Sequence, residues 1–353
     1  MFQSLQQFEK NDFDVGHLIG KGSFFDIFEA SLSKKCTKMK KKCGNGGNSN
    51  LDKPFVLKKI RGPNLYEHKP NISYLNLVHE TKLLASLNHR NIINIHGRGQ
   101  QVLDSTTDQQ YFIVIDRIKY TLEKQLRIWH TDETSCDGVE IPSHRRNKEF
   151  NTRLKVAVSI ASALSYLHSH EIVFRDLKPS NIGFDFKGEV KLFDFQNAIE
   201  NKPEATMNHF DGSPRYMAPE VFRRNDYQCP VDVYSFGILL WEIYTLKKPF
   251  RDLSLKALRR KVIEGYRPKL QTHWSITLRN VMTASWNFNP SKRPTMSTIQ
   301  KVLQSEHKSS ESVMSPEALI LKKYSRTLLS AIRKRNYNDY LDSAHTSKFT
   351  FNN

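Results

Sequence analysis

Four polar side chains with complementary chemistry lie near the middle of the sequence. Asp176, Lys178 and Asn181 stand in the segment I-V-F-R-D-L-K-P-S-N, and Asp194 stands in K-L-F-D-F-Q. A carboxylate can accept the proton of a hydroxyl group, and a lysine can bind phosphate oxygens. An amide and a second carboxylate can hold Mg²⁺. Together these residue types suit a centre for phosphoryl transfer.

The predicted elements around these residues indicate how they are positioned. The apolar pattern of residues 151–168 predicts an amphipathic helix, and the proline-containing stretch after it is irregular. Asp176, Lys178 and Asn181 are therefore expected on a loop. Residues 189–193 alternate in polarity, which predicts a short strand that ends just before Asp194. A hairpin closed at Gly188 is expected to lead into that strand.

This central segment resembles the catalytic loop of the eukaryotic protein kinase family, whose pattern is H-R-D-L-x-x-x-N. The one departure within it is Phe174, which stands where the family has histidine. A G-x-G turn at Gly20 and Gly22 precedes the loop, and G-S-P-R-Y-M-A-P-E, ending at Glu220, follows it in the family's order. The resemblance covers roughly residues 12–303 and is closest to the Ser/Thr-specific, tyrosine-kinase-like branch.

The resemblance implies an α+β, bilobal protein kinase fold. A small β-rich N-lobe with one main helix would span residues 12–118, and a larger, mainly helical C-lobe would span residues 119–303. Residues 31–54 are rich in lysine and then in glycine and asparagine, so we expect a disordered insertion there. A second polar insertion is expected at 130–149. Residues 304–353 are predicted to form a basic tail with an amphipathic helix.

The resemblance also implies roles for the four central side chains. Asp176 would orient the acceptor hydroxyl and take its proton, and Lys178 would steady the γ-phosphate of ATP. Asn181 and Asp194 would hold Mg²⁺. ATP and Mg²⁺ are thus the expected substrate and cofactor.

A lysine on an apolar strand is expected to form an ion pair. Lys58 lies in F-V-L-K-K-I, a predicted strand, where it needs a counter-charge. Glu80, on a helix predicted over 72–87, is the proposed partner, and its spacing to His89 matches the family's. An ordinary surface ion pair, worth at most about 1 kcal/mol, is the alternative.

The remaining nucleotide contacts also follow from the resemblance. Ile115 falls at the gatekeeper position and Ile118 in the segment that links the lobes. The residues expected to bind the nucleotide are Ile19, Gly20, Gly22, Ile27, Val56, Lys58, Glu80, Ile115 and Ile118.

Several residues depart from the family's pattern. Gln196 replaces the glycine of D-F-G, and its Cβ would cost roughly 1 kcal/mol or more if the position requires a positive φ. Phe25 replaces the third glycine of the phosphate-binding loop. Gly183 lies where a bulky residue usually supports the adenine from below, and Val56 lies where alanine usually covers it.

Other positions are assigned structural or regulatory roles. The activation segment would end at Glu220, and Thr206 is the candidate phosphate acceptor within it. Arg175, next to the catalytic aspartate, resembles members that activation-segment phosphorylation switches on. We expect Asp232 to bind backbone of the catalytic loop and Arg293 to pair with Glu220, both in structural roles.

Composition and charge argue against several other classes of protein. The net charge of +18 favours an acidic partner for the lysine-rich loop or the basic tail, but basic and aromatic residues are not interleaved as in a specific nucleic-acid site. Four cysteines without C-x-x-C spacing indicate neither a zinc site nor a disulfide framework. No secretory signal or transmembrane segment is predicted, so a cytoplasmic location is expected, with a nuclear one left open.

We therefore predict a Ser/Thr protein kinase that acts on protein substrates in intracellular signalling. Lys178, within D-L-K-P-S-N, supports this branch, because tyrosine-specific members usually have other residues there. Two alternatives stay open. A pseudokinase scaffold would bind nucleotide weakly or not at all, and a binding protein would act through its basic segments.

Overall fold

A computed structural model describes residues 5–22, 25–34, 54–61, 72–99, 111–134, 143–200 and 212–311. The chain divides into two compact units. We name Met1–Thr121 with Gly183–Asn197 the sheet unit, and Leu122–Ile182 with Ala198–Asn353 the helical unit. Each unit has its own buried apolar core.

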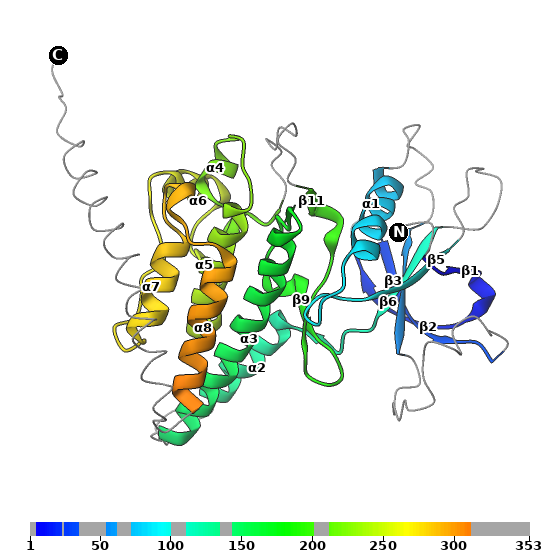
Figure 1. Ribbon diagram of the computed structural model, residues 1–353, viewed down its shortest axis with the longest axis horizontal. Helices are drawn as coiled ribbons and strands as arrows, with labels where there is room; N and C mark the ends of the chain where they lie inside the picture. The colour runs from blue at the N-terminus through cyan, green and yellow to red at the C-terminus, as the bar shows by residue number, and fades with distance from the viewer. Residues whose placement is uncertain are drawn as a thin grey trace, which may run out of the picture. The chain divides into compact units, whose positions relative to one another are not determined.

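The sheet unit is built on a six-stranded sheet in the order β1-β5-β6-β4-β3-β2 (Figure 1). Its strands are β1 (Gln7–Phe8), β2 (Phe13–Lys21), β3 (Phe25–Leu32), β4 (Phe55–Ile60), β5 (Ile95–Gly99) and β6 (Phe112–Asp116). The pairing of β1 with β5 is parallel, and the other pairings are antiparallel. Helix α1 (Ile72–Ser86) packs against β4, β5 and β6.

Strand β4 lies inside this sheet, with a neighbour on each side. Lys58 is paired with Ile27 of β3 and with Ile113 of β6. β4 is buried along almost its whole length, which explains its run of apolar residues. The register therefore places one lysine in an apolar environment.

A small second sheet carries the chain to Asp194. Its order is β10-β9-β7, from β7 (Tyr120–Thr121), β9 (Ile182–Phe184) and β10 (Val190–Leu192). The turn between β9 and β10 has Gly188 at φ +80°. Asp185 stabilises it by accepting hydrogen bonds from the backbone N–H groups of Lys187 and Glu189. The predicted hairpin is confirmed, and the 3-10 helix η4 (Phe195–Asn197) follows it.

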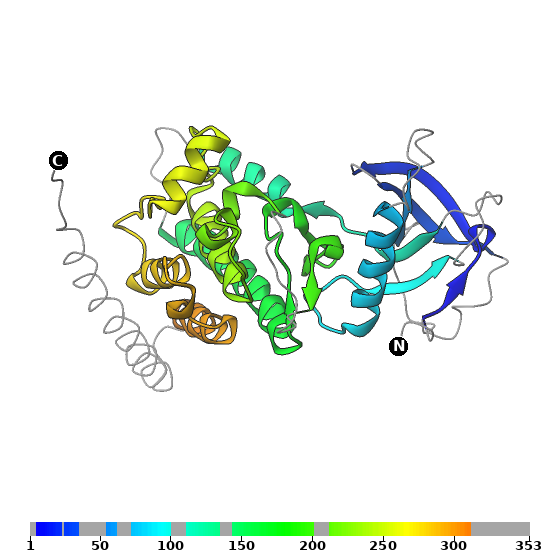
Figure 2. The same ribbon diagram turned by 90° about the horizontal axis from the view of Figure 1, so that it is seen from above.

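The helical unit is organised around α3 and α5. Its helices are α2 (Leu122–Thr134), α3 (Ser143–Ser169), α4 (Pro219–Phe222), α5 (Pro230–Thr245), α6 (Leu255–Ile263), α7 (Ile276–Ser285) and α8 (Met296–Glu311). Helix α3 lies along α8 and also contacts α5, and α5 packs on α7 (Figure 2). Nearly every residue of α5 is buried. Short strands β8 (Ile172–Val173) and β11 (Ile199–Glu200) pair in antiparallel fashion.

The boundaries of α3 and α8 differ from the prediction by several residues. Helix α3 begins at Ser143, eight residues before the predicted start at 151, so part of the expected insertion at 130–149 is helical. The apolar periodicity begins only after these polar first turns, and a pattern search therefore misses them. Helix α8 runs to Glu311, so the first residues of the expected tail continue a helix. Strand β3 runs to Leu32, so the insertion expected at 31–54 does not begin at residue 31. Residues 35–53 and 312–353 lie outside the described residues.

The fold class agrees with the prediction. A smaller unit built on a sheet with one main helix and a larger unit of helices make an α+β protein. No helix in the described ranges combines the length and the apolar character needed to cross a bilayer.

Candidate active site

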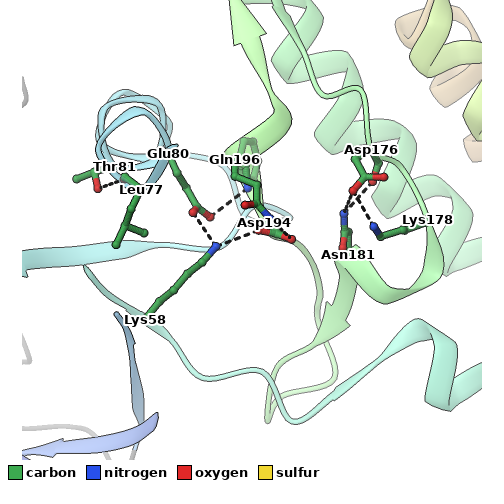
Figure 3. Close-up of polar contacts among 10 residues, drawn as sticks. Lys58, Leu77, Glu80, Thr81, Asp176, Lys178, Asn181, Asp194 and Gln196 are labelled. Atoms are coloured by element: carbon green, nitrogen blue, oxygen red, sulfur yellow. Dashed lines mark hydrogen bonds and ion pairs between the residues drawn. The ribbon is translucent and has the colours of Figure 1, made fainter. Parts of the chain in front are cut away.

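Lys58 and Glu80 form a buried ion pair inside the sheet unit (Figure 3). Lys58 Nζ lies 2.7 Å from Glu80 Oε2, and the two side chains are 6% and 1% exposed. Next to Glu80 on α1, Thr81 donates a hydrogen bond to the carbonyl of Leu77. The predicted pairing is confirmed, and its burial rules out the alternative of an exposed surface pair.

Asp194 joins this pair through a second contact of the lysine. Lys58 Nζ donates to Asp194 Oδ1 at 2.9 Å, while Glu80 Oε1 accepts from the backbone N–H of Phe195 at 3.1 Å. Burial alone would lower the pKa of Lys58, but the carboxylates of Glu80 and Asp194 outweigh it and raise the pKa above its usual range. The lysine is therefore a fixed positive charge at neutral pH.

Gln196 adds a contact that the sequence did not indicate. It lies in η4, and its side-chain Nε2 donates to Asp194 Oδ2 at 3.1 Å (Figure 3). Asp194 itself has a positive φ of 67°, whereas Gln196 is not among the described residues with positive φ. The backbone cost considered for Gln196 therefore does not arise in this conformation.

A second cluster surrounds Asp176 in the helical unit. The side chain of Asp176 is 5% exposed, and Lys178 Nζ donates to its Oδ2 at 2.7 Å. Asn181 Nδ2 donates both to the same Oδ2, at 3.0 Å, and to the backbone carbonyl of Asp176, at 2.9 Å. Ser213 Oγ donates to Oδ1 at 2.9 Å. The three predicted loop residues are thus brought together around one carboxylate.

Ser213 is a member of this cluster that the sequence analysis did not select. Gly212 precedes it with φ +111°, and a Cβ at Gly212 would lie 2.7 Å from the carbonyl oxygen of Arg175. Only glycine allows this close approach, which brings Ser213 to the carboxylate. The motif G-S-P-R-Y contained the signal, but only the fold shows which carboxylate the serine reaches.

Asp232 of α5 holds the backbone of the catalytic loop. The residue is fully buried, and its two carboxylate oxygens accept from the N–H groups of Phe174 and Arg175, each at 2.8 Å. His168 Nε2 lies 2.9 Å from Oδ2. Arg175 has φ 68°, a conformation that these bonds help to maintain. The predicted role of Asp232 is confirmed.

Arg293 and Glu220 form the other predicted structural pair. Arg293 Nη2 donates to Glu220 Oε2 at 2.9 Å, and Arg293 Nη1 donates to the carbonyl of Pro230 at 2.9 Å. Arg293 Nε donates to the carbonyl of Asn287. The pair links α4 to the segment that precedes α8 within the helical unit.

The predicted nucleotide-binding residues all belong to the sheet unit. Gly20 of β2 is paired with Ile27 of β3, and Val56 of β4 is paired with Ile115 of β6. Ile19 is 46% exposed. Their contacts with ATP stay predictions, and Thr206 lies outside the described residues.

Gly183 leaves a space that other side chains of the sheet unit fill. A Cβ built at Gly183 would overlap Ile118 Cγ2 and would lie 3.2 Å from Phe193 Cε1. The bulky residue usual at this position would therefore displace Ile118. Ile118 and Phe193 therefore supply apolar surface where the family's bulky residue would stand.

The side chains available for a metal are oxygen donors. Asn181 uses Nδ2 for its bonds to Asp176, which leaves its amide oxygen for a ligand. Asp194 presents a carboxylate that is 25% exposed. Carboxylate and amide oxygens are the ligands that Mg²⁺ prefers, so the donor chemistry of each residue, taken by itself, fits the predicted ion.

Comparison with known proteins identifies the family to which this arrangement of residues corresponds. Residues 13–307 match the family model described as "Protein kinase domain". RGS domain-containing serine/threonine-protein kinase A of Dictyostelium discoideum is 30% identical over 70% of this chain, which is 20% of that protein. Protein kinase 2 of Dictyostelium discoideum is 30% identical over 74% of this chain, which is 46% of that protein. Serine/threonine/tyrosine-protein kinase HT1 of Arabidopsis thaliana is 36% identical over 43% of this chain, which is 40% of that protein. The chain spans less than half the length of each of these relatives.

Proposed function

The chain belongs to the protein kinase family, and on that premise we propose that it transfers the γ-phosphoryl group of ATP to serine and threonine hydroxyl groups of proteins. The observation that carries the proposal is the cluster around Asp176. Lys178, Asn181 and Ser213 all donate hydrogen bonds to its side chain. A carboxylate held in this way is oriented before any substrate arrives.

In the proposed reaction Asp176 accepts the proton of the attacking hydroxyl group. Its two oxygens are held by different donors, which limits rotation of the carboxylate. Lys178 carries a positive charge next to this carboxylate and would steady the transferred phosphoryl group. Orientation and charge neutralisation, more than covalent chemistry, supply the catalysis of phosphoryl transfer.

Lys58 and Asp194 of the sheet unit, and Asn181 of the helical unit, serve the nucleotide and its metal in this proposal. Lys58, held by Glu80, would bind the α- and β-phosphates, and Asn181 and Asp194 would hold the metal. Mg²⁺, when bound, neutralises charge on the phosphate oxygens. The Lys58–Glu80 pair keeps the buried lysine charged and also fixes its position, whereas a surface lysine would be charged but mobile.

Specificity for serine and threonine rests on the residues of the loop and on the relatives' names. The sequence D-L-K-P-S-N supports it, and one of the relatives compared is named as a serine/threonine kinase. A second is named only as a protein kinase. The third name also includes tyrosine. Retention of Lys58, Asp176 and Asp194 favours an active enzyme over a pseudokinase scaffold. The acidic partner and the cytoplasmic location stay predictions.

The test is Mg²⁺-dependent transfer of labelled γ-phosphate from ATP to casein, followed by phosphoamino-acid analysis. We expect phosphoserine and phosphothreonine with the wild type, and a loss of about 100-fold or more with Asp176→Asn. Asp252→Asn, at a side chain that is 88% exposed, is the matched control and should keep full activity. No transfer by a wild type that ATP still stabilises against heat would favour the pseudokinase.

A further inference from the structure

We infer that Gln196 is a positioning residue that holds the Asp194 carboxylate against Lys58 and thereby weakens the binding of Mg²⁺ with the nucleotide. The inference rests on the proposed function, in which Asp194 is a metal ligand. It assigns to Gln196 a regulatory effect on the metal requirement of the enzyme.

The contacts of Asp194 motivate the inference. Oδ1 accepts from Lys58 Nζ at 2.9 Å, and Oδ2 accepts from Gln196 Nε2 at 3.1 Å, so each carboxylate oxygen has a donor (Figure 3). Glu80 fixes both the lysine and the backbone next to Asp194. Its Oε2 accepts from Lys58, and its Oε1 accepts from the N–H of Phe195. The Asp194 carboxylate is thus held by Lys58 of β4 and by Gln196, two residues further along the chain.

The amide of Gln196 opposes a cation in two ways. It occupies one acceptor position of Oδ2, and its hydrogens place partial positive charge next to that oxygen. A metal that uses Oδ2 must displace this amide or accept a less basic oxygen. Glycine, which the family's pattern has here, offers no such donor.

The hydrogen bond from Gln196 to Asp194 depends on the Gln196 side chain and not on an unusual backbone conformation of that residue. Residues 195–197 form η4, which places the side chain of Gln196 close to the carboxylate two residues earlier. Gln196 is only half-buried and does not adopt a positive φ, so its replacement leaves no buried polar group unpaired and relieves no backbone strain. A variant at this position therefore tests the hydrogen bond and not the fold.

The experiment titrates Mg²⁺ at a fixed concentration of a non-hydrolysable ATP analogue and follows the thermal stability of the full chain. We expect Gln196→Ala to lower the Mg²⁺ concentration at half-saturation by about three- to tenfold, within the net contribution of a typical intramolecular hydrogen bond. Gln196→Leu keeps the bulk of the side chain without a donor and should show the same decrease. Affinity for the analogue without metal should not change, which separates a metal effect from a structural one.

Asp194→Asn distinguishes failure of this inference from failure of the proposed function. If Asp194→Asn leaves the Mg²⁺ dependence unaltered, Asp194 is not a metal ligand and both proposals fall. If Asp194→Asn abolishes the dependence but Gln196→Ala and Gln196→Leu keep the wild-type midpoint or raise it, only the role of Gln196 is overturned. Asn197→Ala, in the same short helix, is the matched control and should leave the midpoint in place.

Discussion

The Arg293–Glu220 pair allows a quantitative test of what holds the helical unit together. The side chain of Arg293 is fully buried and that of Glu220 is 8% exposed. Besides Glu220, the guanidinium donates to the backbone carbonyls of Pro230 and Asn287. Arg293→Met removes the charge and all these donors at similar length.

The expected cost follows from what the substitution leaves behind. Removing one partner of a buried ion pair leaves the other charge uncompensated, which costs about 3–5 kcal/mol. Two carbonyl groups also lose a donor. We therefore expect Arg293→Met to lower the free energy of unfolding by about 4 kcal/mol. The double variant with Glu220→Met should be more stable than this single variant, because no unpaired carboxylate remains.

Urea denaturation followed by tryptophan fluorescence measures this effect. All four tryptophans of the sequence belong to the helical unit, so the signal reports its unfolding. The control is Arg251→Met, whose ion pair with Asp252 joins side chains that are 71% and 88% exposed. This control should cost less than about 1 kcal/mol. A loss below about 1 kcal/mol for Arg293→Met, or a double variant as unstable as the sum of both single variants, would refute the reasoning.

Two further predictions concern buried positions in the two units. Burial raises the pKa of Glu242 from 4.5 to about 7, so the folded state binds a proton that the unfolded state has already released, and stability falls as pH rises from about 5 to 7. Glu242→Gln, which still accepts from the Tyr216 hydroxyl, should be more stable relative to wild type at pH 8 than at pH 5, by about 2–3 kcal/mol in urea denaturation; equal pH dependence of the two proteins would contradict this. Gly183→Leu forces Ile118 aside and should destabilise the sheet unit by about 1–3 kcal/mol, and adding Ile118→Ala should recover part of the lost thermal stability. No recovery in the double variant would show that another contact limits the space.

Local patterns in the sequence were sufficient for much of the fold. Strand β4 was predicted with its observed ends, and α1 differs by one residue at its end. The partners Lys58–Glu80 and Arg293–Glu220 were predicted because the resemblance supplied long-range pairings that no local pattern contains. The start of α3 was missed, because its polar first turns lack the apolar periodicity on which such predictions depend.

The sequence by itself determined which groups are present: a carboxylate, a lysine and an amide on one loop, and a lysine, a glutamate and an aspartate on three separate elements. Only the tertiary structure decided how their atoms are used. It placed Ser213 on Asp176, although 37 residues separate them, and it turned the amide of Gln196 onto Asp194. Hydrogen bonds depend on direction and on distances of a few tenths of an ångström, and these are set by packing and backbone angles that no residue pattern records.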